Sequence, residues 1–140
     1  MVRIKICGNR TPQDVQTAVR YGANAIGFIV GTKFFSEDEI SIADARAIVT
    51  ALPPFVSSVL VTHLQSTDEI LDLYHAVLPT TIQLHNEASM TVIENLRSRI
   101  PHIKLIKAIH IVDSKAIEQA LMFSPWVDSI LLIQPWPSPG

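Results

Sequence analysis

Side chains capable of acid–base chemistry follow several short apolar runs of this 140-residue sequence. Cys7 ends the first run, and His63 and His110 follow the third and the fifth. Gln83 and His85 lie around the end of the fourth run. If these runs are parallel strands, their carboxyl ends meet at one edge of the sheet, where active sites of such folds are built. Thiol and imidazole groups exchange protons near neutral pH, so the spacing predicts a site for general acid–base catalysis.

Cys7 is the only cysteine of the chain and begins a short turn. Gly8 and Asn9 make this turn, and Arg10 precedes a helix whose amino end could bind an anion. Arg10 is also a candidate partner of Cys7, because a nearby cation favours the thiolate that would act as a base. The alternative is that Cys7 is a small buried hydrophobe and Arg10 a solvated loop charge.

A metal site made of Cys7, His63, His85 and His110 is a second interpretation, because Zn²⁺ accepts thiolate and imidazole ligands in a tetrahedron. No two of these residues have the local spacing of an HxH or CxxC motif. We therefore predict that the site holds no metal, and a metal-dependent hydrolase is kept as an alternative. The segment 31–39, which follows the second run, is the longest of the connecting segments and could act as a lid.

The elements that must position these residues alternate along the chain between β-rich runs and amphipathic segments. Helix starts are marked by Thr11-Pro12-Gln13-Asp14, and by a serine followed three residues later by an acid at Ser41 and Ser66. Every run except the last is followed by such a helical segment, which predicts six strands and five helices. The expected strands cover residues 3–6, 25–30, 56–61, 81–84, 103–109 and 127–133.

Two architectures of the α/β class fit this alternation. One is an open doubly wound sheet, and the other is the first six strands of an eight-stranded parallel βα barrel. The expected single domain covers residues 1–133. Residues 134–140 contain three prolines, which exclude a further helix and predict an extended tail.

Composition limits the classes of function. With 48% apolar residues the chain can bury a sizeable core. The net charge is −2 and no basic run could follow a phosphate backbone, so nucleic acid and membranes are not expected partners. No apolar run approaches the roughly 20 residues that a bilayer span requires. One cysteine excludes an internal disulfide, and we expect a cytoplasmic protein.

Five segments carry a family resemblance that periodicity alone does not show. Their order and spacing resemble those of the phosphoribosylanthranilate isomerase family, and the likeness extends over nearly the whole chain. The segments are KICG at 5–8, GANAIGFI at 22–29, LPPFV at 52–56, QLH at 83–85 and IKA at 106–108.

The resemblance implies an incomplete (βα) barrel of TIM type, with six strands and five helices of the eight-fold repeat. It also implies an isomerase of tryptophan biosynthesis, which converts an N-phosphoribosyl anthranilate into a ketose by an Amadori rearrangement without a cofactor. In that family the cysteine of KICG is the general base, which is Cys7 here. The substrate is then a phosphorylated sugar–anthranilate, and the candidate binding residues are Gly8, Asn9, Arg10, Gln83, His85 and His110.

Three positions depart from the family pattern. Ile133 stands where the family has the aspartate that acts as general acid, so His85 or His110 would have to replace it. The acidic stretch 36–39 replaces a basic carboxylate-binding stretch, and Asn86 replaces a glycine. The family's phosphate-binding loops lie beyond strand 6, so we expect little turnover by these 140 residues alone.

This expectation leaves a second class of function open. A non-catalytic paralogue or barrel fragment would act as a binding or assembly module. In both cases the strands at the two edges of the sheet would be exposed, and we expect a second copy or a complementing barrel chain to cover them.

Overall fold

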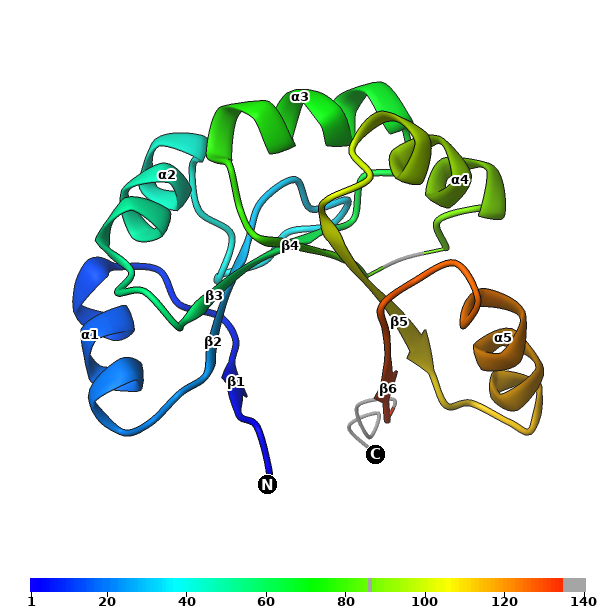
Figure 1. Ribbon diagram of the computed structural model, residues 1–140, viewed down its shortest axis with the longest axis horizontal. Helices are drawn as coiled ribbons and strands as arrows, with labels where there is room; N and C mark the ends of the chain where they lie inside the picture. Colours follow the sequence, from blue (N-terminus) through cyan, green and yellow to red (C-terminus); the bar gives the residue numbers. More distant parts are fainter. Residues whose placement is uncertain (86, 135–140) are drawn as a thin grey trace.

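The computed structural model describes residues 1–85 and 87–134, and it shows strands and helices in strict alternation (Figure 1). The strands are β1 (Lys5–Ile6), β2 (Ala25–Ile29), β3 (Ser57–Thr62), β4 (Thr81–Leu84), β5 (Lys104–His110) and β6 (Ser129–Ile133). The helices are α1 (Pro12–Arg20), α2 (Ile42–Ala51), α3 (Thr67–Val77), α4 (Met90–Arg99) and α5 (Lys115–Phe123). The predicted six strands and five helices are thus confirmed over the described residues.

All neighbouring strands are parallel, and their order in the sheet is the order in the sequence, from β1 to β6. A doubly wound sheet would reverse direction at a switch point, so this order excludes that alternative. Figure 1 shows the sheet as an arc with all five helices on its outer side and with β1 and β6 on either side of the opening. The chain therefore forms a partial (βα) barrel.

The predicted capping residues begin three of the helices. The Thr11 hydroxyl accepts from the Asp14 backbone N–H at 3.2 Å, and the Asp14 carboxylate accepts in return from the Thr11 N–H at 2.9 Å. Ser41 and Ser66 accept in the same way from the residues three positions later. These bonds satisfy backbone donors that have no partner inside the helix, so short helices of 9–11 residues start at defined positions.

The hydrophobic core lies between the sheet and the helices. Ile26 and Phe28 of β2, together with Leu105 and Ile109 of β5, are buried in it. Because side chains alternate along a strand, the residues between them face the concave side of the arc. The residues on the concave face therefore include Gly27 of β2, Val59 and Val61 of β3, Gln83 of β4 and Ala108 of β5.

The strand boundaries differ from the predicted ones by no more than two residues. β5 includes His110, which is thus the last residue of the strand rather than the first residue after it. Of the predicted tail, only Gln134 is described, and residues 135–140 and Asn86 lie outside the described residues. In the described part of the chain, no helix has the length and apolar character needed to cross a membrane.

Apolar side chains are exposed at both ends of the arc. Ile4, just before β1, is 49% exposed, Ile6 of β1 is 43% exposed, and Leu132 of β6 is 55% exposed. Ile117 and Leu121, one helical turn apart on α5, are also exposed. Among residues 1–85 and 87–134, each inner βα unit packs against a neighbour on either side, whereas the first and the last unit each have one uncovered flank.

Candidate functional site

Cys7 lies at the carboxyl end of β1, on the turn that follows the strand, and its side chain is exposed. Its Sγ packs closely over Gly27 of the neighbouring strand. A methyl carbon added at Gly27 would lie 2.9 Å from Sγ of Cys7 and 3.2 Å from its Cα. Gly27 therefore leaves the space that the thiol occupies at the edge of the concave face.

The turn after Cys7 is held by Asn9, which is buried. Its side-chain amide donates to the carbonyl of Ile6 at 2.8 Å and to the carbonyl of Gly27 at 3.0 Å. Its backbone N–H also donates to Gly27 O at 3.1 Å. Gly8, which lies between Cys7 and Asn9, has a φ of +76°, a conformation that favours glycine. Asn9, predicted as a binding residue, thus fixes the position of Cys7 against β2.

Lys5, Gln83 and His85 form a directed hydrogen-bond chain on the concave face. The Lys5 ammonium donates to Oε1 of Gln83, and Nε2 of Gln83 lies 3.2 Å from Nδ1 of His85. Because an ammonium can only donate, Oε1 is the acceptor and the amide nitrogen must donate to Nδ1. The chain therefore holds His85 as the neutral tautomer with its proton on Nε2.

The charges around this hydrogen-bond chain agree with that tautomer of His85. Burial, together with smaller contributions from charge repulsion by His63, His110 and Lys5, lowers the pKa of His85 to about 4. Burial also lowers the pKa of Lys5, whereas the nearby Cys7 raises it. Lys5 is thus a cation that interacts electrostatically with Cys7.

Three imidazoles meet at the carboxyl ends of β3, β4 and β5. The ring centroids of His63 and His85 are 5.0 Å apart and those of His85 and His110 are 5.6 Å apart, both edge to face. Burial lowers the pKa of His63, with Glu39 acting against this. Within residues 1–85 and 87–134, no three histidine, cysteine, aspartate or glutamate side chains are arranged to hold a metal ion. The metal-dependent hydrolase therefore has no support from the described site.

Arg10 lies beside the amino ends of α1 and α2. It lines a hollow together with Thr11, Asp14, Glu39 and Ser41, and its side chain is exposed. This hollow faces the two helix starts, so the structure places Arg10 among capping residues.

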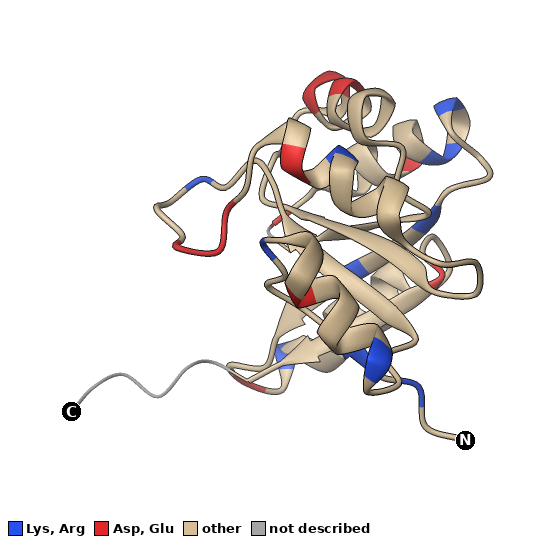
Figure 2. Cartoon of the chain, turned by 90° about the vertical axis from the view of Figure 1, so that its left-hand side faces the viewer, with Lys and Arg blue, Asp and Glu red and all other residues tan. Residues whose placement is uncertain are grey.

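The loop between β2 and α2 stands out from the body of the molecule and carries an acidic run (Figure 2). Glu39 closes the base of this loop, because its carboxylate accepts from the backbone N–H groups of Gly31 and Thr32 and from the Thr32 hydroxyl. A methyl carbon added at Gly8 would lie 3.5 Å from Oδ2 of Asp38. The acidic loop thus brings a carboxylate next to the turn that holds Cys7.

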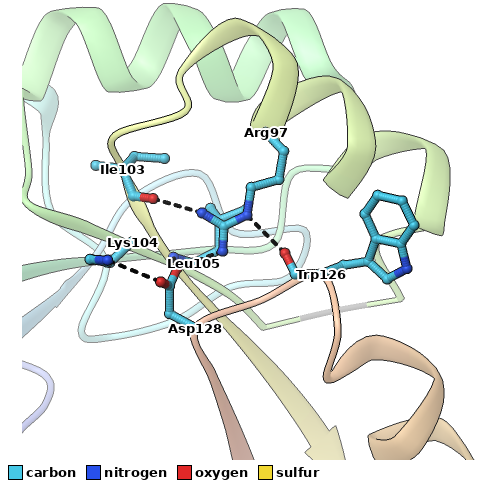
Figure 3. Close-up of polar contacts among 6 residues, drawn as sticks. All are labelled: Arg97, Ile103, Lys104, Leu105, Trp126 and Asp128. Carbon is cyan, nitrogen blue, oxygen red and sulfur yellow. Dashed lines mark hydrogen bonds and ion pairs between the residues drawn. The ribbon is translucent and has the colours of Figure 1, made fainter.

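A separate charged cluster joins β5 to β6 at their amino ends (Figure 3). Arg97 of α4 contacts Asp128 at 2.5 Å and donates to the carbonyls of Ile103 and Trp126. Asp128 also accepts from Lys104 and from the Leu105 backbone N–H. Because the chemically active side chains lie at the opposite ends of the strands, this cluster has a structural role.

The comparisons with known proteins agree on one family. The family model described as N-(5'phosphoribosyl)anthranilate (PRA) isomerase matches residues 4–132. The chain belongs to this family. N-(5'-phosphoribosyl)anthranilate isomerase 2 of Methanosarcina mazei is 39% identical over 131 residues, and the isomerase of Methanocella arvoryzae is 36% identical over 132 residues.

The solved structures of PRA isomerases have the same fold. The crystal structure of the enzyme from Thermotoga maritima is 36% identical and superposes with a TM-score of 0.86, covering 99% of this chain and 64% of that one. A complex with reduced 1-(o-carboxyphenylamino)-1-deoxyribulose 5-phosphate superposes with a TM-score of 0.85 and 36% identity, over 96% of this chain and 66% of that one.

The matched PRA isomerases are longer than this chain. Each of the two relatives aligns with 94% of this chain, which spans 58% and 62% of their respective lengths. The shared part includes β1 and the Cys7 turn, the β2 to α2 loop, and the histidines at the ends of β3, β4 and β5.

Proposed function

We propose that this chain provides the base-carrying part of a phosphoribosylanthranilate isomerase of tryptophan biosynthesis, acting without a cofactor in the cytoplasm. The observation that supports this most directly is the position of Cys7. It is exposed at a strand end, fixed by Asn9 against Gly27, and within electrostatic reach of the Lys5 ammonium. The thiolate is the form of a cysteine that can remove a proton from carbon.

The rearrangement needs two proton transfers. An acid protonates the ribose ring oxygen, the C1′–O bond breaks, and the nitrogen lone pair forms a C1′=N double bond. Cys7 then removes the proton from C2′, and the electrons of that bond form a C1′=C2′ double bond. Return of a proton to C1′ and loss of the proton from the 2′-hydroxyl give the ketose. The neutral His85 Nε2–H is placed to donate a hydrogen bond to a substrate oxygen in this site.

The two uncovered flanks indicate a partner for this chain. Edge strands with exposed apolar side chains promote association, and Ile6 on β1 and Leu132 on β6 are of this kind. Because the matched relatives are longer, we propose that further βα units, of the kind that complete their barrels, cover both flanks. They would pair with β1 and β6 and pack on Ile117 and Leu121 of α5.

An assay of phosphoribosyl anthranilate consumption tests the proposal. The chain is measured alone and after mixing with a separately made segment of the M. mazei relative that covers the unmatched part of its barrel. We expect Cys7-dependent turnover in the mixture, lost in Cys7→Ser. A complex of the two segments without any turnover would instead favour the non-catalytic paralogue, and a dimer of this chain that excludes the added segment would identify a second copy as the covering partner.

A further inference from the structure

We propose that His110 is the general acid of this site, a role that rests on the proposed isomerase function. His110 is the last residue of β5, and its side chain is exposed on the concave side of the arc. The strand is paired firmly at this point, because His110 is the Cα partner of Ile133 and the Ile111 N–H donates to the Ile133 carbonyl at 2.8 Å. β6 thus presents an apolar side chain where β5 presents an imidazole.

The position of His110 suits an acid that works with Cys7. β1 and β5 stand on different sides of the arc in Figure 1, so a sugar held in the concavity would have the thiol on one side and the imidazole on the other. The two proton transfers involve different atoms of the sugar, the ring oxygen and C2′. An acid and a base on different sides can serve both atoms without exchanging a proton directly.

The neighbouring histidine is not suited to this role. His85 accepts a hydrogen bond from Gln83 at Nδ1, so protonation of that nitrogen would break the chain that starts at Lys5. A second positive charge beside the Lys5 ammonium is also unfavourable. His85 therefore stays neutral at the pH where the enzyme would work, whereas the described residues show no hydrogen bond to the exposed ring of His110.

The acidic residues of the β2 to α2 loop are placed differently. Glu39 accepts three hydrogen bonds at the base of the loop, which lower its pKa and keep it ionised. Asp38 lies next to Gly8, on the same side as the base. The groups that face His110 are the rings of His85 and His63 and the apolar Ile133, while Asp113 in the turn after β5 accepts from the Lys115 N–H.

In the reaction, protonated His110 gives its proton to the ribose ring oxygen, and the electron pair of the breaking C1′–O bond remains on that oxygen. The imidazole is then neutral. It takes up the proton of the 2′-hydroxyl in the final tautomerisation, while the Cys7 thiol returns a proton to C1′. Both side chains recover their starting forms, and no oxidant, metal or cofactor is consumed.

The test compares His110→Gln with His75→Gln in the full chain, alone and mixed with the complementing barrel segment. His75 is an exposed histidine of α3, outside the site, and serves as the matched control. The loss of a general acid should lower kcat/KM by about 10²–10⁴-fold in His110→Gln, and the control should stay within about twofold. The double variant His110→Gln/Ile133→Asp should recover part of the loss, with the alkaline limb of its pH profile moved to lower pH, because a carboxyl group replaces the imidazole on the adjacent strand.

The outcomes separate the role of His110 from the proposed function. A His110→Gln variant that keeps wild-type kcat/KM and its alkaline limb, while Cys7→Ser is inactive, overturns the role of His110 and leaves the proposed function in place. A wild type that binds reduced 1-(o-carboxyphenylamino)-1-deoxyribulose 5-phosphate in calorimetry but turns over no substrate also overturns it, because an acid in place should allow reaction. A wild type that neither binds this analogue nor turns over substrate overturns the proposed function itself.

Discussion

Replacing Gly27 with alanine tests the close packing that positions Cys7. The added methyl carbon would lie 2.9 Å from Sγ and 3.2 Å from Cα of Cys7, whereas ordinary contacts between heavy atoms are about 3.5–4.0 Å. Sγ must therefore move by about 0.6 Å or more, and the main chain of the turn must move with it. Such overpacking costs about 1–3 kcal/mol of stability, and a displacement near 1 Å at a reacting group can lower the rate about 10²-fold.

Two measurements read out this displacement. Since Cys7 is the only cysteine, its rate of alkylation by iodoacetamide reports on the site directly, and we expect Gly27→Ala to change this rate because Sγ must leave its place over residue 27. Gly22→Ala is the matched control: no atom lies within 4 Å of the added carbon, but the φ of +92° costs about 1–2 kcal/mol. Equal alkylation rates and equal kcat/KM in wild type, Gly27→Ala and Gly22→Ala would refute the reasoning.

Three further predictions concern the groups around the site and the cluster at the other end of the strands. Asn9→Ala should lower the free energy of unfolding in urea by about 1–3 kcal/mol, because two carbonyls lose the buried amide that donates to them. Lys5→Met should raise the pKa of His85 from about 4, measured by NMR titration, because one nearby positive charge is removed; an unchanged value would contradict the contact. Burial raises the pKa of Asp128, but hydrogen bonds from Leu105, Arg97 and Lys104 outweigh it and lower the pKa to about 2. The carboxylate therefore stabilises the fold fully above about pH 4, and this stabilisation is lost as the pH falls through about 2. Allowing for its partial exposure, the free energy of unfolding of wild type should exceed that of Asp128→Asn by about 1 kcal/mol at pH 6, and this difference should have fallen to less than half near pH 2.

The strands and helices were predictable because local signals specify them. Apolar runs placed all six strands to within two residues, and the Thr11 and Asp14 pair placed the first helix start. The order of the strands was not readable from these signals, because every parallel βα alternation produces the same pattern whether the sheet curves or reverses. The family resemblance, rather than periodicity, chose the barrel.

The site was predictable as a list of positions but not as a set of contacts. The strand ends correctly indicated that His63, His85 and His110 gather. Lys5 was not predicted as a site residue, although it lies two positions before Cys7, and this spacing, which is that of residues on one face of a strand, is the signal that could have found it. The Asn9 amide donates to the carbonyls of Ile6 and Gly27, which belong to two different strands. No local sequence pattern encodes this geometry.

The sequential order of the strands has a consequence for how the molecule opens and closes. Every extensive contact between elements of the described chain joins neighbours, such as β2 with β3, α2 with α3 and β5 with β6. The chain therefore resembles a linear array of repeats, in which each unit is stabilised by the unit before and the unit after it. Amide hydrogen exchange should then be slowest in β3 and β4 and quicken towards β1 and β6. The thiol follows β1, one of the first strands to unfold, and the proposed acid ends β5, which lies next to the other, so a partner that bound both flanks would protect both groups.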